Sequence, residues 1–309
     1  MQIFAPDTKF DFIGKWRIFC GASIAAVVIS LALLAGKGLN FGIDFTGGTL
    51  VQVQFKADQP IGRVREAVSS LRLGETLIQN FGSEREFLLR VERSSGSIEG
   101  VGEQIAGALA ARFGKGAFEV RRAEMVGPQV GADLRQKAVS SMLFALIGIM
   151  LYVSVRFQIR QAVASVIALL HDVILTLGVF AISGKEFTLP IVAAVLTIIG
   201  YSLNDTIVVF DRIRENSRLS RRSEFPDIVN ASINQTLSRT VLTSGTTLAA
   251  VLAFLFLGGE VISDVAFTLA VGIVVGTYSS VYVASPILLI WPSGRRGRSR
   301  RKGAPAKAS

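Results

Sequence analysis

The sequence predicts an α-helical membrane protein with six transmembrane helices and one small α+β domain between the first two helices. Half of the 309 residues are hydrophobic and the mean hydropathy is +0.49, which is too apolar for an ordinary soluble chain of this length. Six apolar runs are long enough to cross hydrocarbon roughly 30 Å thick at about 1.5 Å per residue. The stretch 37–137 has mixed charge and no such run, and its length suits one small domain.

The composition excludes several kinds of site. Cys20 is the only cysteine and lies in the first apolar run, so the chain has neither a disulfide framework nor a cysteine-based metal site. His171 is the only histidine, which excludes a histidine-cluster metal centre. We therefore expect no metal and no cofactor.

The first predicted span, 18–36, follows a short amino-terminal arm, 1–17. A signal peptide is the alternative, but Leu33 stands at the −3 position before Gly36, where cleavage requires a small residue. We therefore expect an uncleaved helix. The other five spans form a transmembrane domain, 138–290, and are expected at 138–155, 162–183, 188–210, 240–258 and 265–290.

The basic residues behind the net charge of +10 flank the apolar runs, a distribution that indicates membrane topology. Those of the predicted internal loops are Arg156, Arg160, Arg212, Arg214, Arg218, Arg221 and Arg222. The positive-inside rule then predicts that both termini are cytoplasmic and that 37–137 is periplasmic. The basic tail, 291–309, is expected to contact anionic membrane lipid. A nucleic-acid or ribosome contact is the alternative for the tail, and no nucleic acid is expected as a partner.

The predicted periplasmic domain has the element order βαββαβ, which is that of a ferredoxin-like fold. Apolar and polar residues alternate in the strands, and the two helices carry apolar residues at helical spacing. The strands are expected at 49–55, 77–81, 86–92 and 118–126, and the helices at 61–71 and 97–113. The domain has no cluster of Ser, His and Asp, so we expect it to bind or move rather than to catalyse.

One carboxylate lies inside the fourth predicted span. Asp205 follows Asn204 about 9 Å from the cytoplasmic edge of the run, at about 1.5 Å per residue. A carboxylate in a span costs about 2.5–3.5 kcal/mol, so it usually faces a partner or a water-filled path. Asn204 and Thr206 beside it favour a functional site over the alternative, an interfacial anchor that reaches out to water.

Two further patterns lie in the third and sixth spans. His171 and Asp172 stand near the middle of the third span, where an ionisable pair is too costly to be incidental. We expect either a buried structural pair or a secondary proton relay. Gly272 and Gly276 have the GxxxG spacing that is typical of close helix contacts.

Four motifs together resemble the SecF family. They are FGIDFTGGTLVQV from Phe41, VGPQVGADL from Val126, SLNDTIVVFDRIREN from Ser202 and NQTLSRTVLTSGTTL from Asn234. The resemblance implies a six-span half of a resistance-nodulation-division type transporter that pairs with SecD in the bacterial inner membrane. It further implies an accessory subunit of the Sec preprotein translocase, without enzymatic activity. Such a subunit uses the proton gradient to promote movement of unfolded preprotein through the Sec translocon channel.

The resemblance also implies that Asp205 is the principal proton carrier, in a relay with Asn204 and Arg239. Arg239 stands at the cytoplasmic entry to the fifth span and is a candidate counter-ion, with a positive-inside anchor as the alternative. Small hydroxyl residues could line a hydrated path or serve plain helix packing. They are Thr206, Thr243, Ser244, Thr246 and Thr247.

Glycines at both ends of 37–137 are candidate hinges that would let this domain swing as a unit. Glycine permits positive φ and close approach of the backbone. Ordinary loop punctuation is the alternative. The candidate hinge residues are Gly42, Gly47, Gly48, Gly127, Pro128 and Gly131.

Three other functions remain open from the sequence. An intramembrane aspartyl protease would need Asp172 and Asp205 at one depth and sharing a proton, whereas their predicted depths differ. A proton-coupled exporter of small molecules or lipids, in the same superfamily, would have two much larger external domains. A purely structural translocon subunit would tolerate Asp205→Asn.

Overall fold

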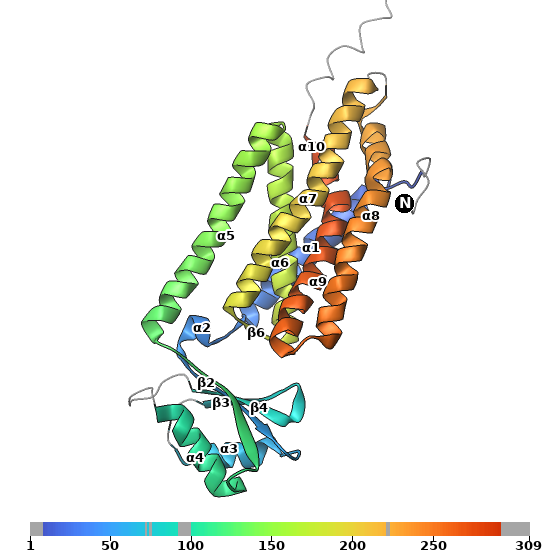
Figure 1. Ribbon diagram of the computed structural model, residues 1–309. Helices are drawn as coiled ribbons and strands as arrows, with labels where there is room; N and C mark the ends of the chain where they lie inside the picture. The colour runs from blue at the N-terminus through green and yellow to red at the C-terminus, as the bar shows by residue number, and fades with distance from the viewer. Residues whose placement is uncertain (1–8, 72, 74–75, 92–99, 221–222, 292–309) are drawn as a thin grey trace, which may run out of the picture.

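The computed structural model describes residues 9–71, 73, 76–91, 100–220 and 223–291. Within these residues, six helical segments are long and apolar enough to cross a membrane, which confirms the predicted number (Figure 1). They are α1 (Trp16–Gly36), α5 (Pro128–Arg156), α6 (Ile159–Ser183), α7 (Leu189–Leu219), α8 (Phe225–Leu257) and a last segment made of α9 (Glu260–Ser279), η2 (Ser280–Ala284) and α10 (Ser285–Ile290). Of the predicted arm, 1–17, the structure describes residues 9–17, whereas the predicted tail, 291–309, lies outside the described residues except for its first residue.

Several helices are longer than the apolar runs that predict them. α5 begins at Pro128, ten residues before the run at 138, and α8 begins at Phe225 rather than near 240. α5, α7 and α8 each have a proline in the first turn, where the missing N–H costs no hydrogen bond. The beginnings of α5 and α8 contain many polar residues, so an apolar run in the sequence does not predict them.

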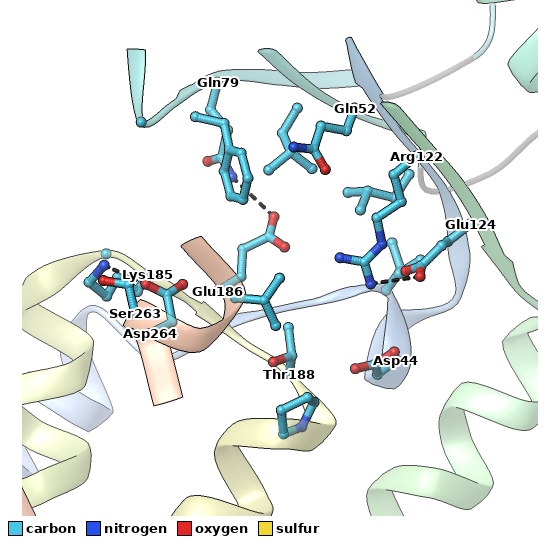
Figure 2. A pocket seen from close by; sticks show the side chains of 18 of the residues that line it. Asp44, Gln52, Gln79, Arg122, Glu124, Lys185, Glu186, Thr188, Ser263 and Asp264 are labelled. Carbon is cyan, nitrogen blue, oxygen red and sulfur yellow. Dashed lines mark hydrogen bonds and ion pairs between the residues drawn. The ribbon is translucent and has the colours of Figure 1, made fainter. Parts of the chain in front are cut away.

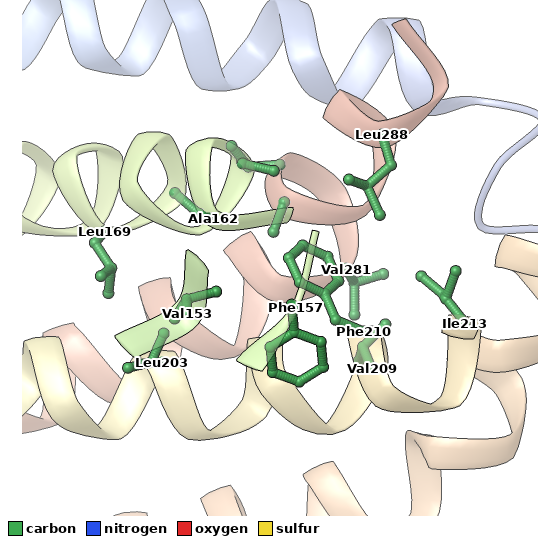
Figure 3. Close-up of a cluster of buried hydrophobic side chains, with 14 of the residues drawn as sticks. Val153, Phe157, Ala162, Leu169, Leu203, Val209, Phe210, Ile213, Val281 and Leu288 are labelled. Carbon is green, nitrogen blue, oxygen red and sulfur yellow. The ribbon is translucent and has the colours of Figure 1, made fainter. Parts of the chain in front are cut away.

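α6 and α7 form the centre of the bundle. In the most apolar 18-residue stretch of each helix, 50% of α6 and 56% of α7 is buried, against 11% in α1, α5 and α8. At the end of the bundle far from the sheet, Phe157 and Phe210 pack with aliphatic side chains of α6, α7, η2 and α10 (Figure 3). In lipid such packing stabilises the bundle through close van der Waals contact rather than through the hydrophobic effect.

The last span crosses α7 at very short distance, as the GxxxG spacing predicts. A Cβ added at Gly272 would lie 2.3 Å from Cδ1 of Ile198, and one at Gly276 would lie 2.9 Å from Cβ of Ser202. Only glycine permits this approach at these two positions. Directly after Ser279, the π-helical segment η2 interrupts the span, and Ser285 Oγ donates to the carbonyl oxygen of Ser280 at 2.7 Å.

The sheet domain, as we call residues 48–126, contains four antiparallel strands in the order β3-β4-β2-β5. Its elements follow in the predicted order: β2 (Gly48–Phe55), α3 (Ile61–Ser69), β3 (Thr76–Phe81), β4 (Ser83–Val91), α4 (Val101–Phe113) and β5 (Phe118–Val126). The two helices cover the sheet face that is turned away from the bundle (Figure 1). Alternate residues of β2, among them Val51 and Val53, pack beneath them with Phe87, Ile105 and Leu109.

A junction that the sequence did not predict joins the sheet domain to the bundle. β1 (Asn40–Phe41) pairs in parallel with β6 (Glu186–Phe187), which lies between α6 and α7. The short helix α2 (Ile43–Thr46) follows β1 and contacts the start of α5. Arg90 of β4 is buried and donates to the carbonyl oxygen of Phe41 and to Oγ1 of Thr46. These contacts position the sheet domain against one end of the bundle.

Candidate functional site

Asp205 lies in the interior of the bundle, where three helices meet. Its side chain is on α7 and only 2% exposed. Its Oδ2 accepts a hydrogen bond from Ser244 Oγ of α8 at 3.0 Å, and Ser244 Oγ in turn accepts one from Thr277 Oγ1 of α9 at 2.9 Å. A carboxylate that accepts from a hydroxyl group and has no direct ion pair is able to bind or release a proton.

Among the described residues, neither Asn204 nor Arg239 makes a direct hydrogen bond or ion pair with this carboxylate. Asn204 is exposed on α7, since successive helical residues point about 100° apart. Arg239 is also exposed, and no ion pair joins it to Asp205 in the described part of the chain. The charge of Arg239 nevertheless acts on the Asp205 carboxylate, so its role as a counter-ion, like a role of both residues in a relay, stays a prediction.

The predicted hydroxyl path is only partly assembled. Ser244 is buried at Asp205, and Thr206 is buried next to it. Thr243 and Thr247 instead donate to carbonyl oxygens of their own helix, at 3.0 Å to Arg239 and 2.9 Å to Thr243. Thr246 makes the same kind of bond to Leu242 and is exposed. Thr277 donates to Ser244 and so extends the chain of hydrogen bonds from Asp205. Nothing in the sequence around Thr277 indicates its contact with Ser244.

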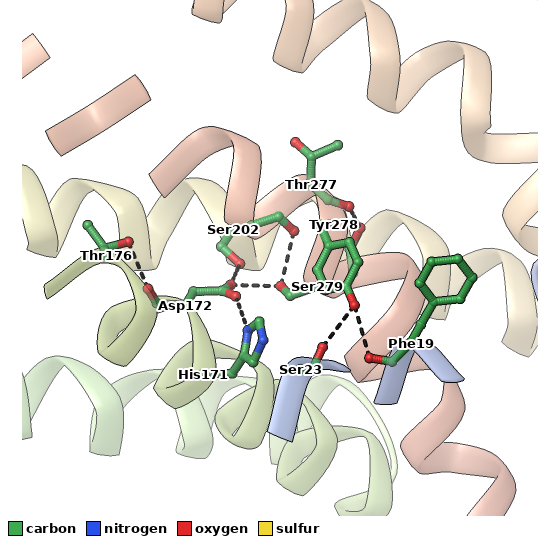
Figure 4. Close-up of polar contacts among 11 residues, drawn as sticks. Phe19, Ser23, His171, Asp172, Thr176, Ser202, Thr277, Tyr278 and Ser279 are labelled. Atoms are coloured by element: carbon green, nitrogen blue, oxygen red, sulfur yellow. Dashed lines mark hydrogen bonds and ion pairs between the residues drawn. The ribbon is translucent and has the colours of Figure 1, made fainter. Parts of the chain in front are cut away.

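His171 and Asp172 form a second buried polar group, on α6 (Figure 4). His171 Nδ1 lies 2.9 Å from Asp172 Oδ1. Asp172 Oδ2 accepts hydrogen bonds from Ser202 of α7 and Ser279 of α9. Asp172 and Asp205 thus have separate sets of partners, which argues against the shared proton that an aspartyl protease requires.

The candidate hinge residues lie at the junction. Gly47 and Gly48 have φ of 72° and 123°, which favours glycine at both positions. Gly131 lies inside α5 rather than in a loop, and a Cβ there would stand 2.9 Å from the backbone nitrogen of Gly47. Gly42, Gly127 and Pro128 have extended or helical backbone that other residues can adopt, although a Cβ at Gly42 would crowd Thr188. The two connections to the sheet domain therefore touch each other, and hinge motion stays a prediction.

Comparison with known proteins decides the family. The profile described as "Protein export membrane protein SecD/SecF, C-terminal" matches residues 106–294, more than half of the chain, and the profile "SecD/SecF GG Motif" matches 32–59. The chain belongs to the SecD/SecF family. The first match contains Asp172 and Asp205, and the second contains Gly47 and Gly48.

Many relatives of this chain are named protein translocase subunit SecF. The chain is 47% identical to the protein translocase subunit SecF of Magnetococcus marinus, over 100% of this chain and 99% of the relative. It is 44% identical to that of Calditerrivibrio nitroreducens, over 96% of this chain and 98% of the relative. Such a family and six apolar helices indicate a multi-pass inner-membrane protein with an accessory role in Sec translocation.

A solved structure of the SecD/SecF family has the same fold. It is the crystal structure of SecDF, a translocon-associated membrane protein, from Thermus thermophilus, with a TM-score of 0.83 and 39% identity. The match covers 94% of this chain and 39% of that chain. A second SecDF structure, in a super-membrane-facing form, matches with a TM-score of 0.70. This chain therefore spans well under half the length of SecDF.

The structure of this SecD/SecF-family chain also reveals a pocket that the sequence did not predict (Figure 2). Its volume is about 480 Å³, and it lies between the open face of the sheet and the loops that follow α6 and precede α9. Glu186 of β6 projects into it and accepts a hydrogen bond from Gln79 Nε2 of β3 at 3.1 Å. Burial raises the pKa of Glu186, and Arg90 partly opposes this effect. Two ion pairs also line the pocket, Lys185 with Asp264 and Arg122 with Glu124, and Asp44 accepts a hydrogen bond from the backbone N–H of Leu189.

Proposed function

We propose that this chain is the proton-coupled SecF subunit of a SecDF complex, which uses the proton gradient to promote translocation of unfolded preprotein by the Sec translocon. The observation that carries this proposal is Asp205. Its carboxylate is buried within a membrane span and accepts a hydrogen bond from Ser244 of α8, whose hydroxyl in turn accepts one from Thr277 of α9. The names and the fold of the relatives support the link to protein export.

The need for a partner, SecD, is supported by the exposed polar side chains of α7 and α8. Asn204, Arg239 and Thr243 are exposed on the bundle although they stand in or next to membrane spans. Such groups are costly in contact with lipid, so we propose that helices of SecD cover them. The SecDF structure, of which this chain matches 39%, supplies the precedent for further helices in one assembly.

The orientation and domain limits belong to the same proposal. Both termini are cytoplasmic, and 37–137 is a periplasmic, ferredoxin-like domain between the span 18–36 and the five-helix domain 138–290. The antiparallel strand order β3-β4-β2-β5, with both helices on one face, supports the ferredoxin-like assignment. Movement of this domain would transmit the effect of proton binding to preprotein.

Substitution of Asp205 tests the function. Asp205→Asn keeps the size and the hydrogen bond to Ser244 but cannot ionise, so the stimulation of export by the proton gradient should be lost. Asp205→Glu keeps a carboxylate and should retain part of the activity. The measurement is gradient-dependent preprotein export in vesicles that contain SecD and the translocon, with copurification of SecD as a check on assembly.

A matched control is Asp211→Asn, six residues later on the same helix. Asp211 is exposed and lies 3.7 Å from Arg156, so its substitution should leave export unchanged. If Asp205→Asn supports gradient-dependent export at the wild-type level, the proposal fails and Asp205 is an anchor or packing residue.

A further inference from the structure

The pair His171–Asp172 lies on α6, is enclosed by three other helices and is not part of the Asp205 group. His171 is 5% exposed and Asp172 is 1% exposed. α7 contributes Ser202, and α9 contributes Ser279 and Tyr278. α1 contributes Ser23, which is hydrogen-bonded to the hydroxyl of Tyr278 (Figure 4). A group buried so deeply between helices has to be satisfied by these partners alone.

The hydrogen bonds to Asp172 are those of an ionised carboxylate. Oδ2 accepts from Ser202 Oγ at 2.5 Å and from Ser279 Oγ at 2.8 Å, and Oδ1 lies 2.9 Å from His171 Nδ1. All three neighbours are able to donate, and an ionised carboxylate only accepts. A charge buried in this way requires an opposite charge close by, which a protonated His171 would supply.

The second nitrogen of His171 leaves room for that proton. Nε2 is buried and has no hydrogen-bond partner among the described residues. The ring of Tyr278 stacks beside the imidazole, with 6.3 Å between ring centroids. The hydroxyl of Tyr278 is engaged elsewhere, with Ser23 Oγ at 2.9 Å and the carbonyl oxygen of Phe19 at 3.0 Å.

The hydroxyls of α9 can adjust to either protonation state. Ser279 Oγ lies within reach of Asp172 Oδ2 and also of the carbonyl oxygen of Gly276 at 3.1 Å. It has one hydrogen, so it donates to the carboxylate when Asp172 is ionised and can turn to Gly276 when Asp172 holds the proton. Thr277 has the same choice between Ser244 at Asp205 and the carbonyl oxygen of Ile273 at 2.8 Å.

The two acidic groups therefore share α7 and α9. Ser202 and Asp205 are three residues apart on α7, which places them on one face of that helix. Thr277 and Ser279 are two residues apart on α9, just before the π-helical segment η2. A change of hydrogen bonding at one group is thus felt by the two helices that hold the other.

We propose that His171 and Asp172 form a second proton-binding site, and that α7 and α9 couple it to Asp205. The proton resides on His171 when Asp172 is ionised, and the site is emptied when His171 becomes neutral. Titratable groups of the surrounding elements are Tyr278 of α9, Tyr282 of η2, Asp205 of α7 and Cys20 of α1. α5 also packs on α6, but its Tyr152 is 57% exposed and turned outward.

The single histidine makes a direct test possible. The full chain is produced with ¹⁵N-labelled histidine and without a histidine tag, then reconstituted in lipid. NMR spectra of the ring nitrogens are recorded from about pH 4.5 to about pH 9, which brackets the usual range of imidazole titration. The signal is assigned by its loss in His171→Gln.

We expect the Nε2 resonance to change between protonated and neutral positions in the wild type. Asp172→Asn should abolish this change, because the imidazolium loses its counter-charge. If Asp172→Asn fails to fold, Ser279→Ala keeps the carboxylate and should alter the titration instead. Asp205→Asn should also alter it, whereas Asp211→Asn should not.

A neutral histidine at every pH would overturn the proton site and identify a structural pair. A normal titration that is the same in the Asp172→Asn chain would overturn the role of Asp172. A titration unaffected by Asp205→Asn would overturn the coupling. None of these readouts depends on protein export, so they are distinct from the test of the proposed function.

Discussion

Among the described residues, the transmembrane bundle buries many more polar side chains than the sheet domain does. The core beneath α3 and α4 contains Phe87, Leu89 and Ile105 as fully enclosed side chains, and the buried polar residues described in this domain are Thr49 and Arg90. The bundle instead encloses His171 and Asp172 as well as Asp205 and many hydroxyl groups. Its large apolar side chains are often outside; Val155, for example, is 89% exposed.

The difference follows from the solvent on each side. In water, burial of apolar surface stabilises the folded state by about 25 cal/mol per Å², so an apolar core is the main source of stability for the sheet domain. In lipid an apolar side chain gains little by moving inward, whereas a polar one avoids a large cost. The interior of the bundle is therefore where charged and hydroxyl groups can be kept, and it is where proton chemistry is to be expected.

The largest effect should come from a cavity in the sheet domain. Phe87→Ala should lower the free energy of unfolding by about 3–5 kcal/mol, since a fully buried ring is removed from a closely packed core. Denaturant unfolding of a soluble fragment 37–137 would measure it, and we expect one cooperative transition. Leu77→Ala is the control, because Leu77 is 45% exposed. Equal effects of both substitutions would contradict the core described here.

A smaller effect is expected where α9 crosses α7. Gly272→Ala should destabilise the bundle by about 1–3 kcal/mol, since its new Cβ would overlap Ile198. Gly200→Ala on α7 is the matched control, because no atom lies within 4 Å of a Cβ at that position. Thermal unfolding in detergent compares the two. Similar melting of both variants would show that the helices are not in the close contact seen here.

The junction should respond more locally. Gly131→Ala would press against the backbone nitrogen of Gly47 and should weaken the contact between α2 and α5 by about 1 kcal/mol, at the lower limit for overpacking. Hydrogen exchange at Gly47, whose amide donates to the carbonyl oxygen of Ile43, would report this loosening. Gly127→Ala has open space and should leave the exchange rate unchanged. Faster exchange in both variants would mean that the junction is loose rather than packed.

The smallest effect is a pH dependence at Glu186. Its raised pKa means that the folded chain binds this proton more tightly than the unfolded chain, so ionisation of Glu186 opposes folding. The cost is absent below the ordinary glutamate pKa, grows as pH rises toward the raised value and is complete above it. Glu186→Gln can still accept from Gln79, and it should raise the melting temperature at neutral pH but not at acidic pH. A variant that melts like the wild type at every pH would contradict this account.

The sequence predicts the elements of both regions because each has a period. Thr49–Phe55 alternates, and the six spans are long and uniformly apolar, so their number and order are confirmed. It does not predict β1 and β6, since strands of two residues have no period to detect. A sequence pattern also does not show how a helix is rotated about its axis, and this rotation decides which side chains meet. The pattern therefore does not show that Asn204 points away from Asp205 or that Thr277 lies near it.

Long-range hydroxyl partners are the part of the site that no local pattern reveals. Ser202 and Ser279 reach Asp172 from two helices far away in the sequence. Serine and threonine are common in helix contacts, so their presence in a span predicts packing as well as chemistry. By contrast, the carboxylates of Asp172 and Asp205 stand out in any apolar run, and both are buried as their cost requires.

The π-helical segment η2 determines which residues at the end of the last span face the core of the bundle. A π turn accommodates one more residue than an α turn, so the residues after Ser280–Ala284 are rotated by about 100° relative to an uninterrupted α-helix. Deletion of a single residue in this segment would convert the π turn to an α turn and would keep Leu288 facing the core that it shares with Phe210, whereas the same conversion without a deletion would rotate Leu288 away from that core. The segment thus absorbs one residue within the span, and deleting that residue should disturb the packing of α10 less than forcing the full-length segment into a regular α-helix.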